Sequence, residues 1–219
     1  MITDIAWDFD GTLFDSYPFI LECFRKALLD CGFTDSDERI LAHIRVTVTN
    51  ALHFYGTTYG IPQEMLLACF QRYNKTPNWD LVKPYPGVRD CLAFVVESGK
   101  RNHLYTHRSK EAVSYLEHSG LKGFFSSFIT SEDGFPPKPA PDALNALTAK
   151  RHIKHENLLM VGDRPIDIDA AWNAGCQSCF YNSNRLPQPQ HATYHVDDYR
   201  QLQQLFRNFM PQQALSRQS

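Results

Sequence analysis

The sequence has no run of lysine or arginine, no long apolar stretch and no internal repeat, and its net charge is only −2. A nearly neutral chain attracts nucleic acid and anionic membranes weakly, so we expect neither as a partner. No segment approaches the roughly 20 apolar residues that span a bilayer. A charged segment followed by an apolar one is also missing at the N-terminus, so we expect no signal peptide and a cytoplasmic protein. A small molecule is the expected ligand.

Cysteine is present but forms no pattern that would hold a metal or a disulfide framework. The six cysteines are scattered along the chain. Cys176 and Cys179 have the spacing of a redox or zinc pair, but no second cysteine pair completes a zinc site. We therefore expect free, buried thiols.

The most informative stretch is residues 8–12, of sequence DFDGT, which follows a plausible buried strand over residues 2–7. Because successive side chains of a strand alternate between faces, Asp8 and Asp10 are expected to point the same way. Gly11 allows a sharp turn just beyond them. Two neighbouring carboxylates repel each other unless a positive charge lies between them. The pair therefore predicts a bound cation and a charged substrate.

Residues from about 16 to 84 show helical periodicity only. Apolar side chains recur at helical spacing over residues 18–29. A second helix is expected over residues 36–48, and a third after Pro62 with Met65 facing inward. This segment is predicted to be an inserted helical unit.

From residue 87 onward, strand and helix patterns alternate. The expected strands cover residues 101–106, 125–130, 157–161, 177–181 and 193–196, and the expected helices cover 88–98, 109–118, 142–151 and 166–174, with a last one ending near 209. Such alternation implies βαβ units, so we predict an α/β fold with a doubly wound parallel sheet.

The predicted division of the chain follows from these patterns. Residues 1–15 and 85–210 form the α/β core, residues 16–84 form a helical cap, and residues 211–219 form a polar, frayed tail. In open α/β sheets ligands bind beyond the carboxyl ends of the strands, so the insert is expected to cover the site.

Polar residues stand at the ends of four predicted strands or in the loops that follow them. They are Asp8, Asp10, Thr106, Lys138, Asp163 and Asp167. Arranged in this order, they resemble the motifs of the haloacid dehalogenase superfamily over nearly the whole chain. Residues 8–16 are similar to the first motif, Thr106 to the second, Lys138 to the third, and residues 162–163 with 167–171 to the fourth. The insert resembles the subclass with an α-helical cap, which includes phosphoglycolate phosphatase-like enzymes and β-phosphoglucomutase.

The resemblance implies Mg²⁺-dependent phosphoryl transfer through an aspartyl-phosphate. An ionised Asp8 needs no base to activate it, and phosphoryl transfer demands little of a nucleophile. Mg²⁺ would offset the repulsion between Asp8 and phosphate. The implied metal ligands are Asp8, Asp10 through its backbone carbonyl, and Asp163, with Asp167 as a supporting group or further ligand. Asp10 would also move protons between the substrate and water.

The resemblance implies a substrate contact for some of the candidate residues and not for others. Thr106 and the backbone amide of His107 would donate hydrogen bonds to the phosphoryl oxygens, and Lys138 would supply positive charge to those oxygens and to Asp8. His107 stands where the family commonly has asparagine, so contact through its side chain is not implied. Arg45, on a predicted cap helix, is a candidate for binding an anionic substrate group.

The motifs are compatible with several functions. The first is a phosphatase that acts on a small phosphorylated metabolite, as a monomer. The alternative is a phosphosugar mutase, although residues 42–47 keep only the arginine of the Gly-Val-Ser-Arg-like segment of those relatives. A dehalogenase does not use an acid at the position of Asp10, and a phosphonate hydrolase needs a cap lysine. A non-catalytic binding protein on this fold is the last alternative.

Overall fold

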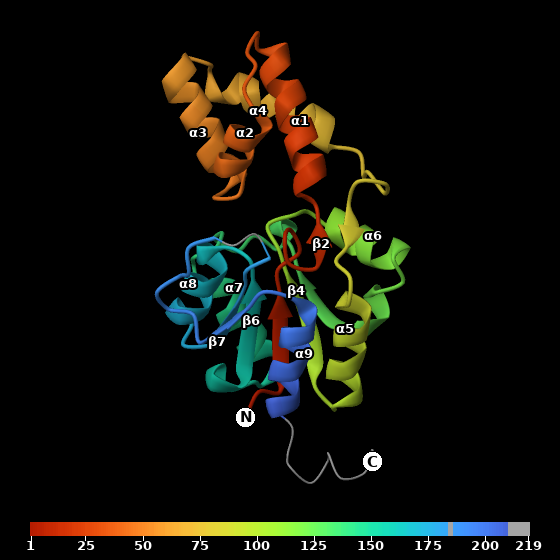
Figure 1. The fold of residues 1–219 in the computed structure, drawn as a ribbon. Coiled ribbons are helices and arrows are strands. Elements are labelled where there is room, and N and C mark those ends of the chain that lie inside the picture. The colour runs from red at the N-terminus through yellow and green to blue at the C-terminus, as the bar shows by residue number, and fades with distance from the viewer. Residues whose placement is uncertain (184–185, 210–219) are drawn as a thin grey trace. The chain divides into compact units, whose positions relative to one another are not determined.

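The computed structural model describes residues 1–183 and 186–209 (Figure 1). The chain divides into two compact units, one formed by Met1–Phe14 with Pro84–Ser219 and the other by Asp15–Lys83. The tail predicted over residues 211–219 lies outside the described residues. Within the described ranges, no helix is long and apolar enough to cross a membrane.

The first unit is built on a parallel sheet. Over the described residues its strand order is β5-β4-β1-β6-β7-β8. The strands are β1 (Asp4–Trp7), β4 (Arg101–Tyr105), β5 (Phe125–Ile129), β6 (Leu158–Gly162), β7 (Gln177–Tyr181) and β8 (Tyr194–Val196). The strand order runs outward in both directions from β1, which confirms the predicted doubly wound α/β fold.

Helices lie on both faces of this sheet (Figure 1). They are α5 (Val88–Glu97), α6 (Glu111–His118), α7 (Asp142–Arg151), α8 (Pro165–Asn173) and α9 (Tyr199–Asn208), with short 3₁₀ turns at Lys122–Phe124, Ser131–Asp133 and His155–Asn157. Ala6 of β1 joins Leu144 of α7 and Ala171 of α8 in one buried cluster. Trp7 is the next residue, and its ring centre lies 5.8 Å from that of Phe206 of α9. Because strand side chains alternate, β1 is buried on both faces.

The three central strands end level with one another. Trp7 of β1 is paired with Leu104 of β4 and with Val161 of β6. Each chain segment that leaves these strands therefore starts at the same edge of the sheet. This carboxyl edge, beside β1 where the strand order reverses, is where ligands bind in open α/β sheets.

The second unit is helical and corrects two predictions. Its helices are α1 (Tyr17–Asp30), α2 (Asp37–Ile44), α3 (Val48–Tyr59) and α4 (Gln63–Asn74). The predicted helix over residues 36–48 is wrong at its end, because Thr47 caps α3 by accepting the Asn50 N–H at 2.9 Å. The prediction that Met65 faces inward is also wrong, since this residue is 45% exposed while the next one, Leu66, is buried.

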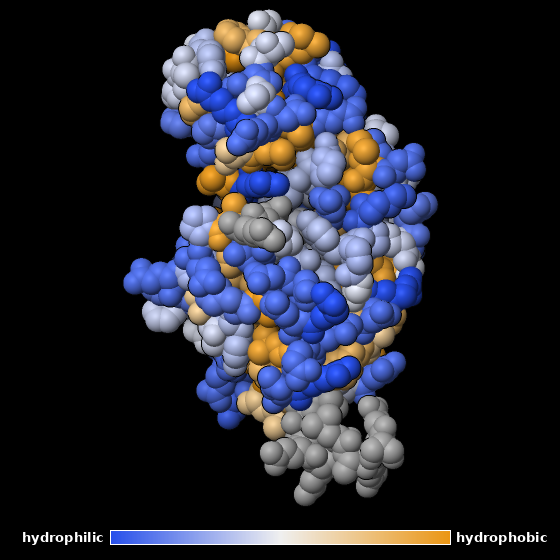
Figure 2. Space-filling view, viewed as in Figure 1, coloured by the Kyte–Doolittle hydropathy of each residue, from blue (hydrophilic) through white to orange (hydrophobic). Residues whose placement is uncertain are grey.

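Two further features complete the described structure. The two-residue strands β2 (Phe14–Asp15) and β3 (Lys83–Pro84) pair with each other where the chain passes between the units. On the face shown in Figure 2, hydrophilic and hydrophobic residues are interspersed, as on most globular proteins. All six cysteines are free thiols, as predicted, but only Cys23, Cys91 and Cys179 are buried, and the expected burial is wrong for the partly exposed Cys31, Cys69 and Cys176.

Candidate active site

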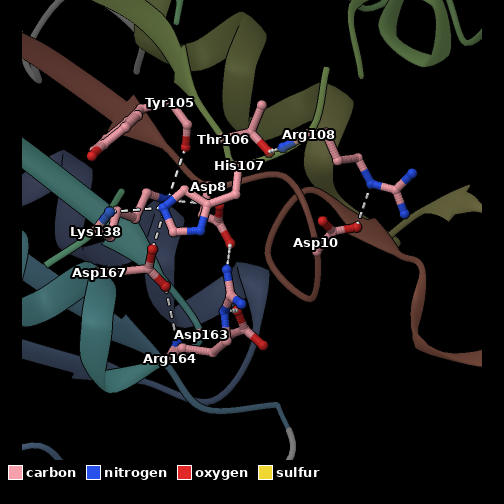
Figure 3. Close-up of polar contacts among 10 residues, drawn as sticks. All are labelled: Asp8, Asp10, Tyr105, Thr106, His107, Arg108, Lys138, Asp163, Arg164 and Asp167. Carbon is pink, nitrogen blue, oxygen red and sulfur yellow. Dashed lines mark hydrogen bonds and ion pairs between the residues drawn. The ribbon is translucent and has the colours of Figure 1, made fainter. Parts of the chain in front are cut away.

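Asp8 is the first residue after β1 and is fully buried. Its backbone N–H donates to the carbonyl of Val161 at 2.9 Å, which fixes the residue at the carboxyl edge of the sheet. Two cations face its carboxylate: Lys138 Nζ is 2.7 Å from Oδ1, and Arg164 Nη2 is 3.5 Å from Oδ2 (Figure 3). Burial raises the pKa of Asp8 and the nearby Asp167 adds to this, while the two cations oppose both effects.

Lys138 is held from three sides. Its Nζ donates to Asp8 Oδ1 at 2.7 Å, to Asp167 Oδ1 at 2.7 Å and to the carbonyl of Tyr105 at 2.9 Å. An ammonium group has three hydrogens, so these protein acceptors account for all of them. Burial by itself would lower the pKa of Lys138, but Asp167 and Asp8 outweigh it and raise that pKa. Lys138 is therefore a fixed positive charge that joins two carboxylates.

The three carboxylates Asp8, Asp163 and Asp167 form an acidic group. Among the described residues, each offers one oxygen, and these oxygens lie within 4.8 Å of one another. All three residues are buried. Carboxylate oxygens are the hard ligands that Mg²⁺ prefers, so this donor set fits the metal that the sequence predicts. Both carboxylate oxygens of Asp167 accept hydrogen bonds, Oδ1 from Lys138 and Oδ2 from the Arg164 backbone N–H at 3.1 Å.

Asp10 lies apart from this group (Figure 3). The strand β1 ends at Trp7, and the chain then folds back on itself, with the Gly11 N–H donating to the Phe14 carbonyl at 2.8 Å and Gly11 at a φ of 73°. Strand alternation therefore does not describe Asp8 and Asp10, and the expectation that the two side chains point the same way stays a prediction. The carboxylate of Asp10 instead accepts a hydrogen bond from Arg108 Nε at 2.7 Å.

Thr106 and His107 follow β4 directly and take different parts in the site. Thr106 is buried, and its Oγ1 accepts the Arg108 backbone N–H at 3.1 Å, so the hydroxyl can still donate its own hydrogen. His107 Nε2 accepts the backbone N–H of Lys138 at 2.8 Å. Burial, followed by the charge of Lys138, lowers the pKa of His107 to about 4. The imidazole is therefore neutral near pH 7 and supports the loop of Lys138.

Arg45 belongs to the helical unit and follows the last residue of α2. Its guanidinium lies 5.7 Å from the ring centre of Tyr17 in the same unit. Its substrate contact stays a prediction.

Sequence reasoning missed two arginines. Arg108 pairs with Asp10, and Arg164 contacts Asp8 at 3.5 Å and Asp163 at 3.9 Å. A signal was present, because each arginine stands within two positions of a motif residue at the end of a strand. Which acid each one meets depends on how the loops fold, and the sequence does not show that.

Comparison with known proteins identifies the family. Residues 5–181 match the model of the haloacid dehalogenase-like hydrolases. The chain belongs to this family. Among curated hydrolases, it is 34% identical over 185 residues to phosphoglycolate phosphatase of Vibrio parahaemolyticus, covering 80% of this chain and 81% of the relative. It is 35% identical over 188 residues to phosphoglycolate phosphatase of Vibrio cholerae, with the same two coverages. These relatives are phosphoric monoester hydrolases.

Solved structures of the family share the fold. A predicted phosphoglycolate phosphatase of Haemophilus somnus 129PT superposes with a TM-score of 0.81 at 22% identity, covering 94% of this chain and 98% of the other. A candidate β-phosphoglucomutase of Thermotoga maritima superposes with a TM-score of 0.76 at 19% identity, covering 95% of this chain and 100% of the other. At these identities the structures show the hydrolase fold alone.

Proposed function

We propose that this hydrolase is a Mg²⁺-dependent phosphatase that cleaves a small phosphorylated metabolite, of the phosphoglycolate or sugar-phosphate type, through an aspartyl-phosphate on Asp8. The observation that carries the proposal is the buried Asp8 carboxylate, bonded to Lys138 within an acidic group at the carboxyl edge of the sheet. The curated phosphoglycolate phosphatases support the substrate class.

In the first half of the reaction, an oxygen of Asp8 attacks phosphorus and the bond to the leaving oxygen breaks. Asp10 gives its proton to that leaving oxygen. Lys138 holds the nucleophile in place, and the Thr106 hydroxyl donates to a phosphoryl oxygen. The nucleophile needs little activation because phosphoryl transfer has a loose transition state.

In the second half, a water molecule attacks the phosphorus of the aspartyl-phosphate. Asp10 takes the water proton, and the phosphorus–oxygen bond to Asp8 breaks with its electron pair returning to the carboxylate. The two halves divide one difficult displacement into two easier ones. Each half needs Asp10 in a different protonation state.

Asp8 and Asp163, with the backbone carbonyl of Asp10, would hold the magnesium ion. Asp167 supports the site by fixing Lys138 and the backbone of Arg164. Mg²⁺, when bound, supplies positive charge that offsets the repulsion between the carboxylates and the phosphate.

The helical unit, residues 15–83, is proposed to act as the cap that sets specificity. This assignment extends the family resemblance, in which the insert after the first motif selects the substrate. Arg45 is the proposed contact for a second anionic group of the substrate.

The proposal is tested with p-nitrophenyl phosphate and Mg²⁺, followed by a panel of phosphorylated metabolites. Asp8→Asn should keep the fold and reduce the rate below about one thousandth of wild type, because the amide is no nucleophile. Asp169→Asn, on the same helix as Asp167, is the matched control and should keep the rate. A near-normal rate in Asp8→Asn would contradict the covalent mechanism.

The products separate the phosphatase from the other functions. With β-glucose 1-phosphate, release of inorganic phosphate indicates a phosphatase, whereas formation of the 6-phosphate indicates a mutase. No turnover of any phosphate ester would favour a binding protein.

A further inference from the structure

The ion pair of Asp10 and Arg108 is short and largely shielded from solvent. Arg108 Nε lies 2.7 Å from Asp10 Oδ1, and the side chains are only 9% and 17% exposed, respectively. Such a charge-assisted bond at low exposure is stronger and more directional than a surface pair. In Figure 3 the pair lies to one side of Asp8, Lys138 and Asp167.

Arg108 is itself held firmly. Its guanidinium carbon lies 5.3 Å from the ring centre of Phe9 and 5.8 Å from that of Tyr115. Its Nη1 is 3.8 Å from Glu111 Oε1, and its backbone N–H donates to Thr106. A planar guanidinium placed between aromatic rings and two carboxylates has little freedom to rotate.

We infer that Arg108 is a positioning residue that holds the carboxylate of Asp10 in place for proton transfer. The inference rests on the proposed function, which gives Asp10 its protons to move. Asp10 stands in the turn after β1, and the hydrogen bond from Arg108 restricts the orientation of its carboxylate. Proton transfer requires a heavy-atom distance of roughly 3 Å, so a carboxylate that turns away loses its contribution.

The two halves of the reaction depend on this positioning to different degrees when the leaving group is good. p-Nitrophenolate leaves without a proton: the bond from Asp8 to phosphorus forms while the bond from phosphorus to the aryl oxygen breaks. Hydrolysis of the aspartyl-phosphate still needs Asp10 to take the water proton. Loss of Arg108 therefore slows the second half and spares the first.

The variant Arg108→Met removes the charge and keeps an apolar side chain against Phe9 and Tyr115. With p-nitrophenyl phosphate and Mg²⁺, kcat should fall about 10- to 100-fold, the usual loss when a general base is misplaced. The ratio kcat/KM should stay near wild type because it reports only the steps up to release of p-nitrophenolate, so KM falls with kcat. Rapid mixing should then show a burst of one p-nitrophenolate per enzyme.

An alkyl ester supplies the second comparison. Its leaving oxygen needs the proton of Asp10, so with 2-phosphoglycolate kcat/KM should fall together with kcat. Arg108→Lys keeps the positive charge without the fixed planar group, and it should recover part of kcat and give a smaller burst.

The matched control is Arg101→Met. Arg101 Nε is also 2.7 Å from a buried carboxylate, that of Asp4, but at the amino end of the sheet. This variant should show wild-type kcat/KM and no burst. If Arg108→Met gives no burst and loses kcat/KM equally with both esters, the positioning role is overturned. If the wild type turns over neither ester, the proposed function itself fails.

Discussion

Single residues at the candidate site balance charges that would otherwise be costly to bury. Lys138 and Arg164 face the acidic group of Asp8, Asp163 and Asp167. Buried charges are tolerated only when partners and hydrogen bonds compensate for the lost water. The excess of negative charge in this group is a physical reason for a divalent cation to bind.

His107 gives a pH dependence at the same scale. Its pKa is about 4 in the folded protein and ordinarily 6.5, so between these values the unfolded chain binds more protons than the native state. The free energy of unfolding must therefore fall as the pH drops from 6.5 towards 4. Urea denaturation at several pH values should show that the free energy of unfolding falls more with decreasing pH for wild type than for His107→Asn, whose side chain does not titrate.

The hydrogen bond between the Lys138 backbone N–H and His107 Nε2 explains why stability falls in acid. Protonated His107 has no acceptor nitrogen, so it cannot accept the backbone N–H of Lys138. If the free energy of unfolding falls equally with decreasing pH in the wild type and in His107→Asn, this hydrogen bond contributes nothing to the acid sensitivity.

At the scale of elements, a second polar network ties three strands together at the amino end of the sheet. Asp4 of β1 contacts Arg101 at 2.7 Å and His103 at 2.8 Å, both on β4. The other ring nitrogen of His103 lies 2.6 Å from the Ser127 hydroxyl on β5. Asp4 and His103 are fully buried. The network lies at the opposite end of the strands from the candidate site, so its role is structural.

Asp4→Asn should therefore lower stability without affecting turnover. Removing one partner of a buried charged pair typically costs about 3 kcal/mol. The bonds to His103 and Arg101 outweigh burial and lower the pKa of Asp4 below 3.8, so this stability exists above that pH and is lost in stronger acid. Urea denaturation should show that the free energy of unfolding of Asp4→Asn is lower than that of wild type at pH 7, and that this difference becomes smaller below pH 3.8. The kcat should be unchanged. A loss of kcat with normal stability would contradict this assignment.

The elements also show how far sequence periodicity reaches. The predicted strand over residues 177–181 and helix over residues 142–151 have these same bounds in the structure. The predicted helix over residues 36–48 fails because apolar spacing continues across the break at Thr47. The single capping hydroxyl of Thr47 interrupts the helix without interrupting the apolar spacing, and such a one-residue signal is much shorter than the stretch over which helical periodicity is recognised.

At the scale of the whole molecule, the sheet brings together residues that are far apart in the chain. Asp8, Lys138 and Asp167 are joined at one ammonium group although 130 and 29 positions separate the lysine from its partners. Because β1 and β6 end level with β4, and Ile129 at the end of β5 pairs with Tyr105 at the end of β4, the segments after β1, β5 and β6 meet at one edge. A ligand that bridges these loops should stabilise the folded chain.

Mg²⁺ should therefore raise stability as well as support turnover. A ligand that binds only the native state stabilises it by about 2.7 kcal/mol at a concentration 100 times its Kd. The midpoint temperature of thermal unfolding of the wild type should rise when Mg²⁺ is added and should fall back when a chelator removes the ion. Asp163→Asn should lose this response, while Asp169→Asn, a change to a partly exposed residue, should keep it. An equal Mg²⁺ response in Asp163→Asn would place the metal elsewhere.

The sequence by itself determined the α/β class, the helical insert and the residues that stand at the strand ends. These follow from local periodicity and from motif residues in a fixed order, which a linear pattern can show. Only the tertiary structure decided that Lys138 also binds Asp167, that Asp10 faces Arg108, and that His107 supports the lysine loop. Those contacts depend on the path of irregular loops after each strand, where side chains follow no period and partners come from distant parts of the chain.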